Sequence, residues 1–171
     1  MNITHRLLAA ILTAGVLLLG VPQVAGASTG PDVSPVFALP GFTPVAGAQS
    51  SLVRLDASIA FDIHTSELAL GSPATLLLVI FNNPAGCSHG VLGLHCGEGD
   101  VVPGGPAQAS VVVAARRTPG TGGSLGAGGS LAVHDTQDAL FGPGLTNPSG
   151  ADVHLVIRQN GANVQASVHE A

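Results

Sequence analysis

Residues 52–64, Leu-Val-Arg-Leu-Asp-Ala-Ser-Ile-Ala-Phe-Asp-Ile-His, carry the pattern that decides the fold class. Apolar residues recur at every second position, with mostly charged or polar residues between them. A helix would spread these apolar side chains around its circumference, whereas a strand presents alternate residues to one face. The segment is therefore predicted to be a half-buried strand, or two strands joined by a bend. The residues expected to face inward are Val53, Leu55, Ala57, Ile59, Phe61 and Ile63.

Five further segments have the length and composition of strands. Residues 75–81 form a run that contains no charged residue and fits a central strand buried on both faces. Alternation or β-branched residues mark the others, which are residues 110–115, 130–134, 152–158 and 164–169. Turn residues separate these segments, and Asn160-Gly161 is typical of a two-residue hairpin. The glycine-rich residues 120–129 are expected to be a connection.

These segments together predict the fold class. Six to eight short strands separated by frequent turns indicate an all-β fold, an antiparallel immunoglobulin-like β-sandwich, with a small barrel as the alternative. A single domain is expected over residues 51–171. The Pro-, Gly- and Ser-rich residues 28–50 are expected to form an N-terminal arm, in which residues 36–39 pair as a short edge strand.

Residues 1–27 have the organisation of a secretory signal peptide. His5 and Arg6 precede an uncharged apolar run over residues 7–20, and Ala25-Gly26-Ala27 offers the small-residue pattern that signal peptidase requires. The run is about 14 residues long, shorter than the roughly 20 that a permanent transmembrane helix needs. We expect cleavage, no stable membrane anchor and a secreted or extracytoplasmic mature chain; an uncleaved anchor is the alternative.

The two cysteines of the chain, Cys87 and Cys96, lie nine positions apart. Outside the cytosol such a pair is expected to form a disulfide. His89 and His95 lie in the same stretch, so a zinc site of two cysteines and two histidines is the alternative. The disulfide is favoured because the adjacent residues His95 and Cys96 point in different directions in most backbones.

The charged and aromatic composition excludes several kinds of partner. The chain contains five Arg and no Lys against ten acidic residues, and it has no Tyr or Trp. Without residues 1–27 the formal charge is −6, which disfavours nucleic acids and anionic membranes through repulsion. The usual aromatic platforms for sugars and bases are missing as well. The expected partner is an unidentified protein or a small ligand.

Histidine is the remaining candidate for site chemistry. His64, His134, His154 and His169 lie on predicted strands, and His64 and His154 share the outward register with nearby aspartates. If these strands are neighbours, imidazole and carboxylate groups would suit Zn²⁺ or Cu²⁺. Alternation assigns a face but not a strand order, so the simpler interpretation is polar residues on solvated faces. No cofactor is predicted.

Residues 122–126, Gly-Gly-Ser-Leu-Gly, match the Gly-x-Ser-x-Gly string of serine hydrolases. That motif requires a strand, a sharp turn and a following helix, and no helical pattern follows Ser124. A small serine hydrolase is therefore the weaker alternative. The chain is predicted to be a secreted, non-enzymatic binding or surface-interaction module, with a secreted metal-binding protein as the other alternative.

Three segments share a pattern with a known family. They are His-Thr-Ser-Glu-Leu at residues 64–68, Val-Ile-Phe-Asn-Asn-Pro at residues 79–84, and residues 139–158, which contain Leu-Phe-Gly-Pro-Gly-Leu. Over about residues 50–170 the chain resembles secreted bacterial β-sandwich proteins of unknown function, distantly similar to CHRD (chordin-type) domains. It departs from that family at residues 76–78, which are Leu instead of aromatic, and at residues 159–161, where Gln-Asn-Gly replaces a His-Gly-Pro-like turn. The resemblance implies a secreted β-sandwich and carries over no catalytic residue.

Overall fold

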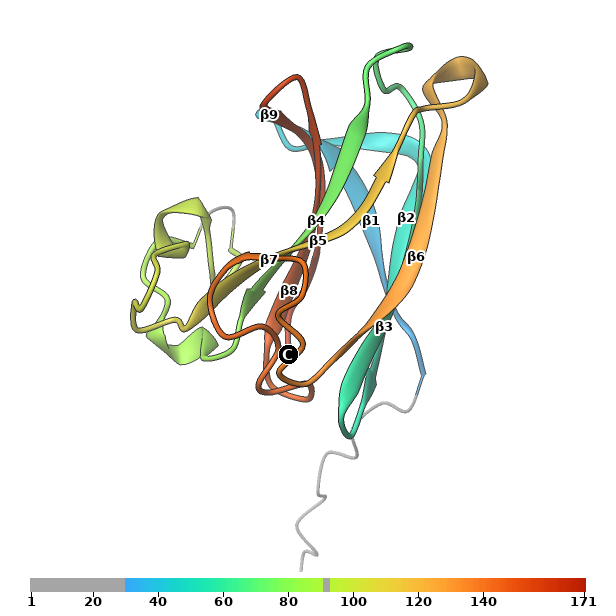
Figure 1. Cartoon of the computed structure of the whole chain (residues 1–171). Coiled ribbons are helices and arrows are strands. Elements are labelled where there is room, and N and C mark those ends of the chain that lie inside the picture. Colours follow the sequence, from blue (N-terminus) through green and yellow to red (C-terminus); the bar gives the residue numbers. More distant parts are fainter. Residues whose placement is uncertain (1–29, 91–92) are drawn as a thin grey trace, which may run out of the picture.

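The computed structural model describes residues 30–90 and 93–171 and confirms an all-β, antiparallel fold (Figure 1). The described strands form one hydrogen-bonded sheet in the order β6-β3-β2-β1-β9-β8-β4-β5-β7. Their bounds are β1 Asp32–Ala38, β2 Thr43–Leu55, β3 Ser58–Thr65, β4 Ala74–Phe81, β5 Ala109–Arg117, β6 Leu125–Ala132, β7 Ala139–Phe141, β8 Asp152–Gln159 and β9 Ala162–His169. Three 3₁₀ turns accompany them, η1 Pro84–Gly86, η2 Glu98–Asp100 and η3 Thr121–Gly123.

The residue 52–64 segment forms part of a hairpin between β2 and β3, whose strands pair from Leu55 opposite Ser58 to Gln49 opposite His64. The predicted inward face is confirmed in β3, where alternate apolar residues from Ile59 onward are buried. The prediction is wrong in β2, where Leu52 is buried and Leu55 is 50% exposed. Residues that lie opposite each other in paired strands share a face of the sheet. The two-residue turn sets odd-numbered residues of β3 opposite even-numbered residues of β2, so the inward residues are odd-numbered in β3 and even-numbered in β2.

The β4–β8 pair is the most deeply buried part of the sheet. β4 pairs with β5 on one side and β8 on the other, which confirms a central strand buried on both faces. In β8 the predicted inward residues Val153, Leu155 and Ile157 are fully buried. Val156, on the opposite face of β8, is only 8% exposed. The outward register of β8 is therefore covered around Val156, whereas Arg158 at its far end is exposed.

The N-terminal segment enters the sheet. β1 lies between β2 and β9, so the expected edge position of residues 36–39 is wrong, and β2 already begins at Thr43. β9 pairs with β1 only through Phe37 and Ala38. Pro35 precedes that pairing and lies next to a register shift against β2, where a residue without an N–H is tolerated.

The glycine-rich segment is a second correction, because residues 125–129 belong to β6 and pair with β3 along its length. A Cβ on Gly128 would lie 2.7 Å from an Asp62 carboxylate oxygen, and a Cβ on Gly129 would lie 3.1 Å from the Phe61 ring. Glycine fits here because β3 side chains lie across β6 and leave little room for a larger residue. The strand predicted at residues 130–134 is thus the end of a longer one, and β7 corresponds to no predicted strand, so the described total is nine instead of six to eight.

The sheet curls around one main core and carries a second, smaller core on its outer face (Figure 1). Alternate residues of β4 divide between them. Leu76, Leu78 and Ile80 face the main core, and Leu77, Val79 and Phe81 face the second core. The second core is covered by the connection between β4 and β5, which we call the covering loop (residues 82–108).

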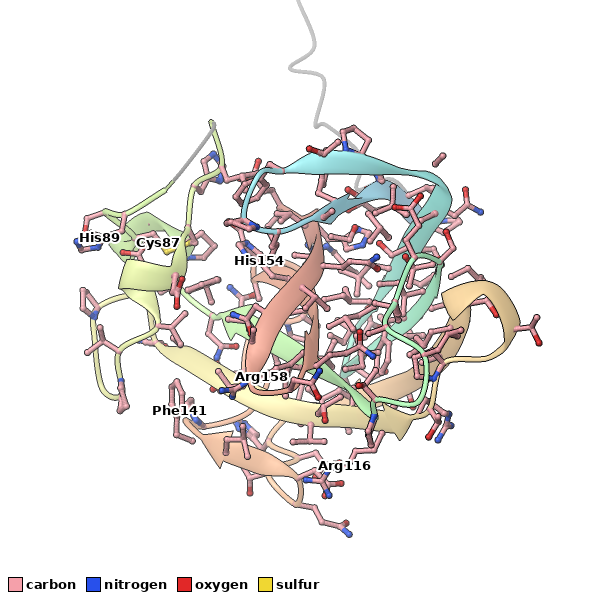
Figure 2. The ribbon with its side chains drawn as sticks, turned by 90° about the horizontal axis from the view of Figure 1, so that it is seen from above. Cys87, His89, Arg116, Phe141, His154 and Arg158 are labelled. Atoms are coloured by element: carbon pink, nitrogen blue, oxygen red, sulfur yellow. A yellow bond between two sulfur atoms is a disulfide. The ribbon has the colours of Figure 1, made fainter. Side chains whose placement is uncertain are left out.

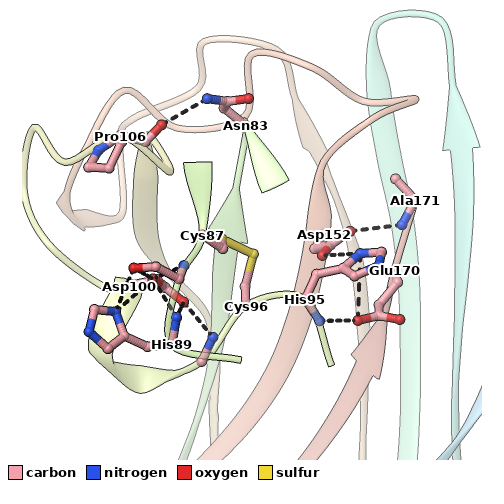
Figure 3. Close-up of a disulfide and its surroundings, with 12 residues drawn as sticks. Asn83, Cys87, His89, His95, Cys96, Asp100, Pro106, Asp152, Glu170 and Ala171 are labelled. Carbon is pink, nitrogen blue, oxygen red and sulfur yellow. Dashed lines mark hydrogen bonds and ion pairs between the residues drawn. A yellow bond between two sulfur atoms is a disulfide. The ribbon is translucent and has the colours of Figure 1, made fainter. Parts of the chain in front are cut away.

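The covering loop is held by the predicted disulfide, which is confirmed between Cys87 and Cys96, with a Cα–Cα distance of 5.2 Å. Because the two sulfur atoms are bonded to each other, neither cysteine can serve as a thiolate ligand in the alternative zinc site. Asp100 accepts hydrogen bonds from the backbone N–H groups of Ser88, His89 and Gly97 (Figure 3). Burial raises the pKa of Asp100, but these bonds and the His89 ring outweigh it and hold the pKa well below its usual range.

The signal peptide expected over residues 1–27 lies outside the described residues. Within the described residues, no helix has the length and apolar character needed to cross a membrane.

Asp100→Asn tests the role of this carboxylate in the loop. The substitution removes the charge that three backbone donors share, and we expect the free energy of unfolding in urea to fall by about 1–3 kcal/mol. Glu98→Gln, in the same 3₁₀ turn but exposed, is the matched control and should change stability by less than about 0.5 kcal/mol. Equal effects of the two substitutions would contradict this role.

Candidate functional site

The four histidines proposed as metal ligands lie at separate places. His64, on β3, is exposed, and its Nε2 lies 2.8 Å from Asp62 Oδ1. His134 follows β6 in an exposed turn with φ of 62°. His169 pairs with Val153 and faces the main core with it, so the next residue of β8, His154, faces the opposite side of the sheet. The structure brings no three of these residues together.

His169 belongs to a buried hydrogen-bonded chain that links β1, β2 and β9. Its Nδ1 lies 2.9 Å from Asp32 Oδ2, its Nε2 lies 2.8 Å from Ser50 Oγ, and Ser50 donates to Ser167 Oγ. The order Asp, His, Ser is that of a hydrolase triad. Ser50 is 2% exposed and His169 is fully buried, so a substrate carbonyl cannot reach the hydroxyl. We interpret these hydrogen bonds as a polar cross-link between the three strands within the core.

Ser124 does not have the surroundings of a hydrolase nucleophile. It follows η3 in an extended conformation, and β6 begins at the next residue. Its hydroxyl donates to the carbonyl of Thr121. The strand–turn–helix context that the motif requires is therefore absent at this point of the structure.

An apolar cavity of about 320 Å³ lies on the outer face of the sheet, between the covering loop and the turn that joins β1 to β2. Its walls come from that turn, from β4, β8 and β9, and from the covering loop. The principal apolar lining residues are Leu39, Phe42, Phe81, Leu94, Val156 and Ala166. The cavity lies beside the second core, where the covering loop leaves part of the sheet face open.

His154, labelled in Figure 2, is the polar lining residue that is most enclosed by apolar walls, whereas Glu98 and Asn163 are exposed. Its ring packs edge-on against Phe81, with 5.1 Å between ring centroids, and its buried Nε2 has no hydrogen-bond partner. Burial lowers the pKa of His154 to about 4; the charge of Glu170 opposes this with a smaller effect, and His169 adds a smaller lowering. The imidazole is therefore neutral near pH 7 and can donate or accept one hydrogen bond. Apolar walls with one unpartnered polar group are typical of a small-molecule site.

The sequence pattern identified His154 but assigned it to a solvated face. The informative signal was the run at residues 75–81. When a strand is buried on both faces, the strands next to it are covered on both faces as well. A residue such as His154, on the strand beside residues 75–81, is then shielded from solvent. Other lining residues, such as Phe81, Val156 and Ala166, lie on predicted strands, whereas those from the expected arm and from the loop are marked by no periodicity.

Searches against protein-family models, curated proteins and solved structures found no match for this chain. The chemistry of the site is therefore used as the guide to function.

Acid titration of stability tests the burial of His154. Its pKa is about 4 in the folded protein against 6.5 for an ordinary histidine, so the unfolded chain binds more protons between these pH values. The free energy of unfolding should therefore be highest above pH 6.5 and fall by about 2–3 kcal/mol as the pH is lowered toward 4. Burial also lowers the pKa of His169, so this residue likewise contributes to the loss of stability in acid.

The measurement is urea unfolding of the wild type and of His154→Gln at about pH 7 and about pH 4.5. Because glutamine does not titrate, the variant should lose about 2 kcal/mol less than the wild type across this interval. Equal losses in both proteins would contradict the burial of this imidazole.

Proposed function

We propose that this chain is a secreted, non-enzymatic binding protein that takes a small, largely apolar molecule into the cavity at His154. The observation that carries the proposal is the unpartnered, buried Nε2 of His154 among apolar walls. A buried polar atom without a partner is unfavourable. Because Nε2 itself is buried, a ligand in the cavity would have to shift the neighbouring side chains slightly to form a hydrogen bond with it.

The cavity also indicates the chemistry of the ligand. A volume of about 320 Å³ is at the small end of the range for ligand sites. A neutral imidazole favours a hydroxyl or carbonyl group over a charged one. Glu98 lies among the lining residues and disfavours anions. We therefore expect a neutral, mostly apolar molecule with one hydroxyl or carbonyl group.

The non-enzymatic part of the proposal rests on what surrounds His154. Its Nε2 contacts no hydroxyl or thiol that it could activate, and the Ser50 hydroxyl is bonded to the buried His169 instead. The separate positions of His64, His134, His154 and His169 give no support to a shared Zn²⁺ or Cu²⁺ site. Ser124 likewise gives no support to a hydrolase.

Secretion is proposed from the sequence of residues 1–27, and the Cys87–Cys96 disulfide is compatible with an oxidising compartment. An immunoglobulin-like sandwich topology and a relationship to CHRD-type proteins stay predictions. Ligand binding in the cavity depends on neither.

Binding of 1-naphthol, followed by its fluorescence, tests the cavity. We expect saturable binding to the wild type. Ala166→Leu adds a side chain to the wall and should weaken binding at least about tenfold, because it fills the space that the ligand needs. Ala162→Leu, at an exposed position of the same strand, is the matched control and should bind normally. Absence of saturable binding, or equal binding by both variants, would contradict the proposal.

A pair of ligands of similar shape tests the role of His154. The wild type should prefer 1-naphthol over 1-methylnaphthalene by roughly threefold to tenfold, the value of one hydrogen bond. His154→Phe keeps an aromatic ring but removes both ring nitrogens, so it should bind the two ligands about equally. A preference that survives in this variant would show that another group holds the hydroxyl.

A further inference from the structure

A second cluster of polar side chains lies across the disulfide from Asp100 and His89 (Figure 3), and none of its three residues lines the cavity. His95 comes from the covering loop, Asp152 begins β8, and Glu170 directly follows β9. His95 Nδ1 lies 3.5 Å from Asp152 Oδ2 and 3.8 Å from Glu170 Oε1. Among the described residues this is the one group of three potential metal ligands whose donor atoms all lie within 4.8 Å of one another.

Asp152 is the unusual member of this cluster. Its side chain is completely buried, and its Oδ1 accepts a hydrogen bond from the backbone N–H of Ala171. Its Oδ2 is buried without a hydrogen bond and lies toward His95. A buried carboxylate that lacks a full set of partners is strongly unfavourable. The cluster therefore contains an acceptor atom whose partner is missing.

The nearest arginine does not supply that partner. Arg54 donates its hydrogen bonds to the backbone carbonyls of Pro148, Ala151, His169 and Glu170. These bonds fix the end of β9 beside the start of β8 without using the Asp152 carboxylate. Glu170 adds a second negative charge close by, and its Oε1 accepts a hydrogen bond from the His95 backbone N–H.

The two distances from His95 fit a metal ion placed between the three residues, and all three donor atoms lie within 4.8 Å of one another. Zinc bonds of about 2.0–2.1 Å in tetrahedral geometry separate neighbouring ligand atoms by about 3.4 Å. The two distances from His95 Nδ1 are close to that value. Imidazole nitrogen with carboxylate oxygen suits Zn²⁺, whereas Ca²⁺ and Mg²⁺ prefer oxygen ligands throughout.

We propose that His95, Asp152 and Glu170 form a binding site for a divalent transition-metal ion of the Zn²⁺ type. The three side chains supply three ligands and leave a fourth position open toward a surface hollow that Pro84 and Ala85 also line. The site uses none of the four histidines that the strand pattern indicated, and it does not depend on a ligand in the cavity. A bound ion would join the covering loop to β8 and to the chain after β9.

Zinc titration of the disulfide-bonded protein tests this site. We expect calorimetry to show one Zn²⁺ bound per chain and the melting temperature to rise with Zn²⁺ concentration, while Ca²⁺ at the same concentration has no such effect. His95→Ala should weaken Zn²⁺ binding at least about tenfold. His64→Ala is the matched control, because His64 is also exposed and also pairs with a carboxylate, and it should bind Zn²⁺ as the wild type does.

Because His95 is 60% exposed, its substitution should leave the fold intact, and Glu170→Gln provides a second variant at a partly exposed position. Loss of Zn²⁺ binding in both variants, with circular dichroism unchanged, would support the site. The competing arrangement is a protonated His95 that pairs with both carboxylates. In that case Zn²⁺ would not raise the melting temperature of the wild type, or would raise it equally in His95→Ala, and either result would overturn the proposal.

Discussion

The central pair of strands, β4 and β8, has to be covered on both faces, and the rest of the structure depends on this requirement. Leu76, Leu78 and Ile80 face one side of the sheet, while Leu77, Val79 and Phe81 face the other. Neither set is stable in water, because each would expose a continuous apolar surface. Curling of the sheet covers the first set. The second set is covered by the loop between β4 and β5.

The covering loop also brings together the residues of both candidate sites. Its described residues form short 3₁₀ turns and no strand, so its position depends on the disulfide and on the Asp100 hydrogen bonds. Leu94 and Cys96 line the apolar cavity, whereas His95 between them lies beside Asp152 and Glu170. The same three-residue segment therefore contributes Leu94 and Cys96 to the apolar cavity and His95 to the polar cluster.

The sequence predicted individual strands better than it predicted their environment. The buried run of β4 and the inward residues of β8 follow from composition and alternation, and the structure confirms both. The inward register of β2 was missed because the turn after Leu55 reverses it. The glycine-rich part of β6 was missed because glycine disfavours strands in general, while at Gly128 and Gly129 the neighbouring Asp62 and Phe61 leave little room for a larger side chain.

Local pattern by itself determined the all-β class, the hairpin at Asn160-Gly161 and the pairing of two lone cysteines, because each depends on residues close together in the chain. Strand order was decided only by the tertiary structure. It sets Asp32 beside His169, buries His154 and gathers His95, Asp152 and Glu170 from three separate elements. The physical reason is that alternation assigns each side chain to a face of its own strand, whereas the packing of distant apolar surfaces decides which strands are neighbours.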